Sequence, residues 1–472
     1  MNPRLTPAAQ CYALQQLAQR AGLTGEINAA QLVDLQIPVY YAPAEQVQTA
    51  SPALIIVPCR DSAWQELQRR PAASLDWLPP ERYLPPGWPN TKRAALPVLF
   101  WGADYEDGSR PFATRRADGS VIFYADILAA TVLMLSRWEE WQQAQTDEHG
   151  RFPGQASLAY RQGFLDRPIV DEYALVLRAW LQLLRPAWQP TPGRFTVQLS
   201  HDIDFLVRFK SPLPVLKNLA GDLLKRRSAR LARQTCQDAW YSLREPAKNS
   251  YAQNILELAT QARRRAFKSS FFFLATEPAD PFFHSGYDPN APPLPGILAA
   301  LQKLDVQIGL HASYATWQDP LQLAKERACL QTATGLSQMG GRQHYLRFKA
   351  PETWRAYVKA GLSYDASLGF ADIEGFRCGT CHPFRVFDLQ ADQELPLQEQ
   401  PLIVMDGTLF QYRKLSNAQA LARIQLLAER CRQAEGTFSF LWHNTSFTGP
   451  WAAQRTVYLR ALDWLAQLFR EE

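Results

Sequence analysis

The chain has 472 residues, which is long for one ordinary domain and predicts two or three. Hydrophobic residues make up 47% of it and charged residues 20%, a globular composition that lets each part bury a core. The formal net charge of +5 is mild for this length and does not favour a nucleic-acid partner.

The apolar patterning and the cysteine content indicate the cellular compartment. The first thirty residues contain no continuous apolar run suited to a signal peptide, and no later stretch reaches the roughly 18 to 20 residues of a membrane span. Seven cysteines, scattered from Cys11 to Cys431, suit reduced thiols better than a disulfide framework. We therefore expect a soluble, cytoplasmic protein.

The first 185 residues mix short strands and helices. Apolar runs predict strands at 52–59 and 96–102, a strand running into a buried helix at 123–143, and a helix at 171–184. The following segment, "RPAWQPTPGR", has three prolines and a glycine and is typical of a linker. We expect an N-terminal α/β domain over 1–185, of unknown role, and a second domain over 195–472.

In the second domain strands and helices alternate. Strands are predicted near 195–200, 270–275, 305–310, 342–348 and 438–442, and helical stretches such as "AQNILELATQARRRAF" and "PETWRAYVKAG" separate them. This alternation is typical of a parallel sheet or a barrel.

A basic segment interrupts this alternation. "KNLAGDLLKRRSARLARQ", 217–234, places leucines at helical spacing beside Lys225, Arg226, Arg227, Arg230 and Arg233. One reading is a solvated face on an inserted helix, and the other is contact with an anionic membrane surface or polyanionic ligand.

Two aspartates follow the first strand of the second domain. In "FTVQLSHDIDF" the alternation of Phe195, Val197 and Leu199 predicts a buried strand, and a period of two puts Asp202 and Asp204 on one face at its carboxyl end. In parallel α/β folds ligands and catalytic groups gather at that end. The alternative is a turn in which the aspartates cap the next segment.

Histidines stand near the ends of this and other predicted strands. His201 follows the strand at 195–200, His311 follows the strand near 305–310, His344 lies beside Arg342 and Tyr345, and His443 follows an aromatic strand. Any one of them alone would more often be structural, but their recurrence together with a carboxylate pair indicates a shared site.

The order of these motifs resembles the polysaccharide deacetylases of the NodB-homology type, and more narrowly a subgroup with an extra N-terminal α/β domain. The motifs are "HDID", "GLHASY", "RQHYLRF" with "PETWRAYVKAGLSYDASLG", "GFRCGTCHPF" and "LWHN", within about 195–450. The resemblance implies an irregular (β/α) barrel and a divalent metal, with Zn²⁺ as the expected ion, that serves hydrolysis of an N-acetylated carbohydrate.

The resemblance also implies roles for individual residues. Asp204 and His311 would hold the metal, Asp202 would be the general base and His443 the general acid. Arg342 would orient Asp202, and the backbone amide of Tyr345 would donate to the oxyanion. For the outer positions, Asp365 would orient a histidine, and Arg377 and Trp442 would contact substrate.

One position departs from the family pattern. The second motif usually has two histidines four residues apart, but the position four after His311 is Ala315. His344 is the best substitute for the missing third ligand, because a strand would point it the same way as Arg342. The alternatives are a metal held weakly by two protein ligands and water, or no metal.

Three functions are compatible with these features. The first is a metal-dependent deacetylase, and the second is a non-catalytic relative that binds carbohydrate. The third is a peripheral membrane or scaffold protein that uses the basic segment 217–234. The pair "CGTC" at 378–381 does not favour a zinc or redox site, since no second cysteine pair stands at metal spacing.

Overall fold

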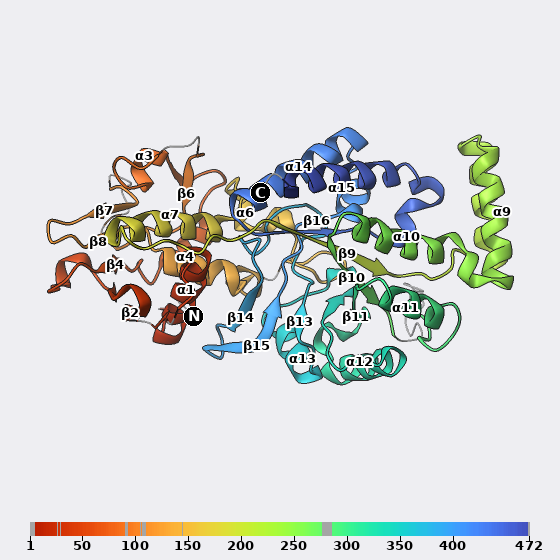
Figure 1. Cartoon of the computed structure of the whole chain (residues 1–472), viewed down its shortest axis with the longest axis horizontal. Coiled ribbons are helices and arrows are strands. Elements are labelled where there is room, and N and C mark those ends of the chain that lie inside the picture. The colour runs from red at the N-terminus through yellow and green to blue at the C-terminus, as the bar shows by residue number, and fades with distance from the viewer. Residues whose placement is uncertain are drawn as a thin grey trace.

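The computed structural model of the chain describes residues 5–25, 27–28, 30–89, 93–103, 105, 110–143, 145–275 and 286–470. It is a mixed α/β protein with two main sheets, the larger of which is mostly parallel. The first sheet and its helices lie toward one end of the long axis, and the second sheet follows along that axis (Figure 1).

The first sheet has six strands in the order β1-β2-β3-β4-β8-β7. Their bounds are Ile27–Asn28, Gln31–Leu32, Ile37–Tyr41, Leu54–Ile56, Val121–Phe123 and Ala113–Arg115 in that order. Only the β3–β4 and β4–β8 pairs are parallel. All three residues of β4 are buried, which accounts for the continuous apolar run there. Strands β5 (Asp76–Leu78) and β6 (Leu96–Val98) form a separate antiparallel pair.

Helices surround this sheet. Their bounds are α1 Pro7–Arg20, α2 Ala63–Arg69, α3 Pro80–Tyr83, α4 Ile127–Leu135, α5 Trp138–Gln142, α6 Leu158–Arg161 and α7 Ile169–Leu184. Every residue of α4 is buried, so this helix lies in the core with α1 and α7 against it. Thr6 begins α1 by accepting a hydrogen bond from the Ala9 amide, and Pro7 follows it at the first helical position.

The second sheet has nine strands in the order β14-β15-β13-β12-β11-β10-β9-β17-β16. Their bounds in that order are Phe384–Asp388, Gln393–Glu399, Tyr364–Asp365, Gly341–Gln343, Gln307–Ala312, Lys268–Phe273, Thr196–Ile203, Thr437–Leu441 and Val404–Met405. All pairs are parallel except β14–β15. The strand order ends at β14 and β16, so a closed barrel is not shown, although the Leu402 amide, just before β16, donates to the Leu368 carbonyl, just after β13.

Helices connect the parallel strands or follow the last of them. They are α8 Pro212–Ala220, α9 Ala229–Arg244, α10 Ser250–Arg264, α11 Leu294–Gln302, α12 Pro320–Thr334, α13 Glu352–Ala360, α14 Asn417–Gln433 and α15 Gln454–Arg470. None of the described helices is long and apolar enough to cross a membrane.

Two predicted elements differ from the structure. The strand expected over 342–348 is wrong after Gln343, because a 3₁₀ turn, η7 (His344–Leu346), follows, with positive φ at Tyr345 and Leu346. The single basic helix expected over 217–234 is also wrong: α8 ends at Ala220, a π-helical turn η4 (Gly221–Lys225) follows, and α9 begins at Ala229.

Buried apolar side chains of both sheets and their helices form one continuous cluster, from Leu5 to Leu468. The Pro-rich connector between α7 and β9 runs along this body. The Thr191 amide donates to the Gly22 carbonyl, and the Gly193 amide donates to Glu435. The domain boundary at 185–195 stays a prediction.

Candidate functional site

Five parallel strands end at one edge of the second sheet and carry the polar residues. Asp202 lies in β9, and Asp204 follows that strand directly. In the strand register Ser200 pairs with Leu441, and Leu441 pairs with Met405, so the ends of β17 and β16 lie beside β9. On the other side, His311 pairs with Arg342 across β11 and β12. The carboxyl ends of parallel strands therefore bring these side chains to one place.

A cavity of about 260 Å³ opens at this edge. It is lined by Arg151, Asp202, Asp204, Phe205, His311, His344, Tyr345, Leu346, Met405, Gly407, Gln411, Tyr412, His443, Thr445 and Ser446. Six of the predicted site residues are among them, although they are spread over more than 240 positions of the sequence. His201, by contrast, faces away: its Nδ1 lies 2.8 Å from the Trp442 carbonyl oxygen and its ring packs on Phe271.

Asp204, His311 and His344 form a group that could hold a metal ion. One ligand atom from each lies within 4.8 Å of the others. His311 Nε2 is 3.2 Å, and His344 Nε2 is 3.6 Å, from Asp204 Oδ1. Two donors on one tetrahedral zinc, each ~2.1 Å from it, stand roughly 3.4 Å apart, so both separations are suitable.

The hydrogen bonding of His311 gives a physical test of this fit. Its Nδ1 lies 3.0 Å from the Arg342 carbonyl oxygen, which can only accept, so Nδ1 carries the proton. In the neutral ring Nε2 then presents a lone pair to Asp204 Oδ1, a buried oxygen without a hydrogen bond among the described residues. Two lone pairs at this distance call for a cation between them, which is either a proton on Nε2 or a metal ion. The residues fit a metal.

The titration of the three groups agrees with this arrangement. Burial lowers the pKa of His344 to about 4, so its imidazole is neutral at pH 7, the form that binds metals. Burial also lowers the pKa of His311, but the carboxylates of Asp202 and Asp204 outweigh it and raise that pKa. Burial raises the pKa of Asp204, yet the neighbouring imidazoles, His311 first, lower it well below its usual range.

Arg342 holds Asp202. Its Nη1 donates to Asp202 Oδ1 at 3.0 Å and to Ser200 Oγ at 2.9 Å, and its Nε donates to the Ala366 carbonyl at 2.7 Å. Both side chains are buried, which makes this a strong charge-assisted contact. The geometry is that of the orienting role which the family resemblance implies for Arg342.

Asp406 is a site residue that the sequence reasoning missed. It follows β16 directly, and its carboxylate accepts a hydrogen bond from His443 Nδ1 at 2.6 Å, one from the His443 amide at 3.0 Å, and one from the Ser446 hydroxyl. Burial lowers the pKa of His443, but Asp406 outweighs it and raises that pKa to about 10. His443 Nε2 then points toward Asp204 Oδ2, 3.9 Å away. The run "LIVMDG" was the available signal, since it too is an apolar strand followed by an aspartate.

Arg151 was also missed, and it comes from the region before the second sheet. Its Nη1 donates to the Tyr345 carbonyl at 2.8 Å and its Nη2 to the Tyr412 hydroxyl at 3.0 Å, while Asp147 holds its Nε at 2.7 Å. The contact with Tyr345 supports a residue whose φ is +64°, a conformation that costs a non-glycine residue free energy. No sequence pattern could have connected positions so far apart.

Three predicted residues lie away from this cavity. Asp365 is buried beside Ser367, whose hydroxyl donates to it at 2.5 Å, and it faces Glu399; burial raises its pKa. Arg377 is buried and donates two hydrogen bonds to Glu140, at 2.9 and 2.7 Å. Trp442 is buried among aromatic rings. Their placement gives no support to the orienting and substrate-contact roles expected for them.

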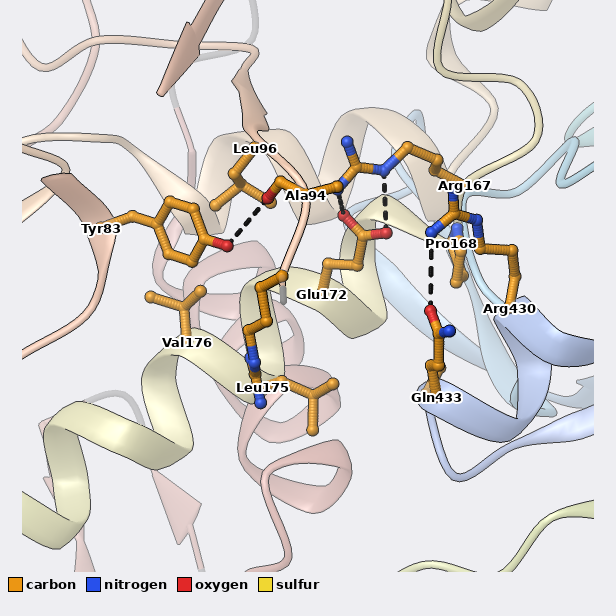
Figure 2. A pocket seen from close by; sticks show the side chains of 12 residues that line it. Tyr83, Ala94, Leu96, Arg167, Pro168, Glu172, Leu175, Val176, Arg430 and Gln433 are labelled. Atoms are coloured by element: carbon orange, nitrogen blue, oxygen red, sulfur yellow. Dashed lines mark hydrogen bonds and ion pairs between the residues drawn. The ribbon is translucent and has the colours of Figure 1, made fainter. Parts of the chain in front are cut away.

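A second cavity, of about 400 Å³, lies between α7 and the end of α14. Figure 2 shows two of its three arginines with a side-chain partner: Arg167 pairs with Glu172 at 2.5 Å, and Arg430 reaches Gln433 at 3.5 Å. Tyr83 donates to the Ala94 carbonyl at 2.9 Å (Figure 2). This cavity therefore has fewer side chains available for catalysis or metal binding than the site at the strand ends.

Asp171, Cys381 and His382 form another group with ligand atoms within 4.8 Å of one another. Asp171 is already engaged, since it pairs with Arg20 at 2.9 Å and accepts from the Cys381 amide at 2.8 Å. Burial raises the pKa of the Cys381 thiol well above its usual range, which disfavours the thiolate that a metal requires. This group joins α1, α7 and the segment before β14.

Comparison with known proteins gives partial matches only. Residues 76–186 match the model of DUF7033, described as a family of unknown function. A crystal structure from Mycobacterium smegmatis, described as a "putative polysaccharide deacetylase", aligns over 60% of this chain and 93% of its own, at 14% identity and a TM-score of 0.36. A search of curated proteins returned no match. The structural likeness is distant and assigns no activity to this chain.

Proposed function

We propose that the protein is a metal-dependent hydrolase that removes an acetyl group from an N-acetylated sugar. The observation that carries the proposal is the cluster of Asp204, His311 and His344, with a carboxylate and an imidazole, each held by its own partner, beside it. The motifs that resemble the NodB-type deacetylases support the amide substrate. The aromatic side chains of Phe205, Tyr345 and Tyr412 around the cavity suit the apolar faces of a sugar ring.

Asp204, His311 and His344 would hold the metal, which when bound would lower the pKa of a water and polarise the acetyl carbonyl. Asp202, held by Arg342, is placed to accept a proton from that water. The reaction forms a bond between the water oxygen and the carbonyl carbon and breaks the bond between that carbon and the sugar nitrogen.

His443 supplies the proton that the leaving nitrogen needs. Asp406 accepts from Nδ1, so that Nε2 is the atom directed at the cavity. The raised pKa of His443 keeps the ring protonated at neutral pH, as a general acid requires. Acetate and a free amino sugar are the products.

The test measures metal content and acetate release on the same preparations. The purified protein, loaded with zinc, is incubated with short N-acetylglucosamine oligomers, and free acetate is measured with and without a chelator. We expect acetate release that the chelator abolishes. His443→Ala should retain zinc and lose acetate release by about 10²–10⁴-fold. A wild-type protein that binds no divalent ion would disprove the proposal, while tight binding of the oligomers with full zinc and no acetate would indicate a binding protein.

A further inference from the structure

A helical hairpin projects from the second part of the chain. It consists of α8, η4 and α9, over residues 212–244, inserted in the connection between β9 and α10. In Figure 1 α9 stands at one end of the long axis, beyond α10 and away from both sheets. The connection leaves the second sheet at the edge where Asp204 and the candidate site lie.

The hairpin exposes large apolar side chains. Of the twelve large hydrophobic residues that are well exposed in the described part of the chain, six lie in it: Leu213, Leu216, Leu223, Leu224, Trp240 and Leu243. Their exposed fractions run from 55% for Leu223 to 80% for Leu243. The four leucines of α8 and η4 follow the spacing i, i+3, i+10 and i+11, which places them along one side of the helix. Apolar surface gathered in this way indicates an interaction site.

The exposed charges of the hairpin all have one sign. Residues 212–244 contain seven lysines and arginines and two aspartates, a net charge of +5 that equals the formal net charge of the whole chain. The rest of the chain is therefore neutral in sum. Both aspartates are buried, so the solvent-facing charges come from Lys217, Lys225, Arg227, Arg230, Arg233 and Arg244, with Arg226 partly exposed.

The two buried aspartates fix the shape of the hairpin. Asp222 pairs with Arg226 at 2.7 Å and accepts from the Thr235 hydroxyl at 2.6 Å, which ties η4 to α9. Asp238 pairs with Arg208 at 3.0 Å and accepts from the Ser250 amide at 3.0 Å, which ties α9 to the body. The apolar and basic side chains therefore project from a hairpin whose shape is fixed by buried ion pairs and hydrogen bonds.

We propose that this hairpin docks on the surface of an anionic lipid bilayer. Leucine and tryptophan enter the boundary between headgroups and acyl chains, while lysine and arginine extend to the phosphates. Protein interfaces, in contrast, have few charges at their apolar centre, whereas here basic residues such as Lys217 and Lys225 stand directly beside exposed leucines. The absence of an exposed carboxylate on the described hairpin suits a negative surface.

The experiment is vesicle co-sedimentation with the full-length protein. The vesicles contain either phosphatidylcholine alone or an equal mixture of phosphatidylcholine and phosphatidylglycerol, and the salt is raised from ~0.05 to ~0.5 M. We expect binding to the anionic vesicles that weakens as salt is added. Arg230→Gln/Arg233→Gln should reduce the partition coefficient about 30-fold, since each basic residue near the surface contributes about fivefold.

Matched variants test whether vesicle binding depends on the hairpin or on exposed basic and apolar side chains in general. Arg263→Gln/Arg264→Gln removes two exposed arginines from α10, and Leu321→Gln changes an exposed leucine of α12; both should bind like the wild type. Leu216→Gln/Leu243→Gln should bind at least about 10-fold more weakly. Equal binding to both vesicle types, or equal loss in the α10 control, would overturn the proposal. So would self-association of the wild type, lost in the leucine variant, without vesicle binding.

Discussion

His344 is the residue on which the proposed metal site depends. In that proposal it supplies the ligand that Ala315 cannot, and its Nε2 lies 3.6 Å from Asp204 Oδ1. We expect His344→Ala to bind zinc more than about 100-fold more weakly than the wild type. That loss is larger than the one expected when a residue that only hydrogen-bonds to a metal ligand is removed. Titration with zinc measures this, and His382→Ala, which removes a histidine away from the cavity, should keep wild-type affinity. Zinc retained at full affinity in His344→Ala would make His344 a substrate contact.

Asp406 positions His443 without entering the reaction. Asparagine at position 406 would offer an amide in place of one carboxylate oxygen, so Nδ1 of His443 would lose its fixed proton and its charge partner. We expect Asp406→Asn to lower kcat by about 10²–10⁴-fold with little change in KM and with zinc content unchanged. Parallel losses of zinc and of thermal stability would instead assign Asp406 a structural role.

Strand ends explain which residues of the site the sequence could predict. Asp204, His311 and His443 each stand at or just after the end of an apolar strand, and all three line the cavity at one edge of the sheet. Asp406 also follows an apolar run, "LIVM", but only two residues of that run form a strand, so the signal was weaker there. Arg151 reaches the cavity through tertiary packing alone, so no local signal points to it.

At the scale of elements, α5 and the segment after β13 are joined by buried charges. Glu140 accepts two hydrogen bonds from Arg377 and one from Arg137 Nε at 2.8 Å. Burial raises the pKa of Glu140, but Arg377 and Arg137 outweigh it and lower that pKa below 4.5. We expect Glu140→Gln to reduce the free energy of unfolding at pH 7 by about 3–5 kcal/mol, because it leaves the buried Arg377 without its carboxylate, while Arg137 keeps its ion pair with Glu139.

The ion pair of Glu140 with Arg377 makes the free energy of unfolding depend on pH. The lowered pKa of Glu140 sets the sign of that dependence. Around pH 4 the unfolded chain binds a proton at Glu140 and the folded chain does not, so stability rises with pH there. The contribution is fully present above about pH 5 and is lost as the pH falls through the folded pKa. Denaturant unfolding at pH 7 and near pH 3.5 should therefore show a smaller difference between wild type and Glu140→Gln at the lower pH. The exposed Glu81→Gln is the control, and a difference independent of pH would contradict this account.

Periodicity predicted elements better than their ends. The helix expected at 171–184 is α7, Ile169–Leu184, and the strands expected at 52–59 and near 438–442 are β4, Leu54–Ile56, and β17, Thr437–Leu441. The end of β12 was not, because Tyr345 and Leu346 have positive φ without a glycine to signal it. Their conformation depends on contacts such as that of Arg151, which local sequence does not contain.

At the scale of the whole molecule, direct contacts hold together the parts of the chain that lie before and after the predicted boundary at 186–194. Residues 191–194 are exposed, so we expect limited proteolysis to cut there first. The cut pieces should nevertheless stay together, because Arg20 pairs with Asp171 against Thr380, Arg377 pairs with Glu140, and Arg178 pairs with Glu435 at 2.6 Å.

Size-exclusion chromatography of the nicked protein measures this association. Both pieces should elute as one particle that retains zinc, since Arg151 of the first piece completes the cavity wall of the second. Glu140→Gln should release the pieces at lower denaturant, because it removes the buried partner of Arg377. Pieces that separate without denaturant would show two independent domains, and first cleavage at another place would refute the linker. If both pieces elute as one particle, Arg151 still lines the cavity after the connecting chain is cut. The first 185 residues are then a structural part of the site.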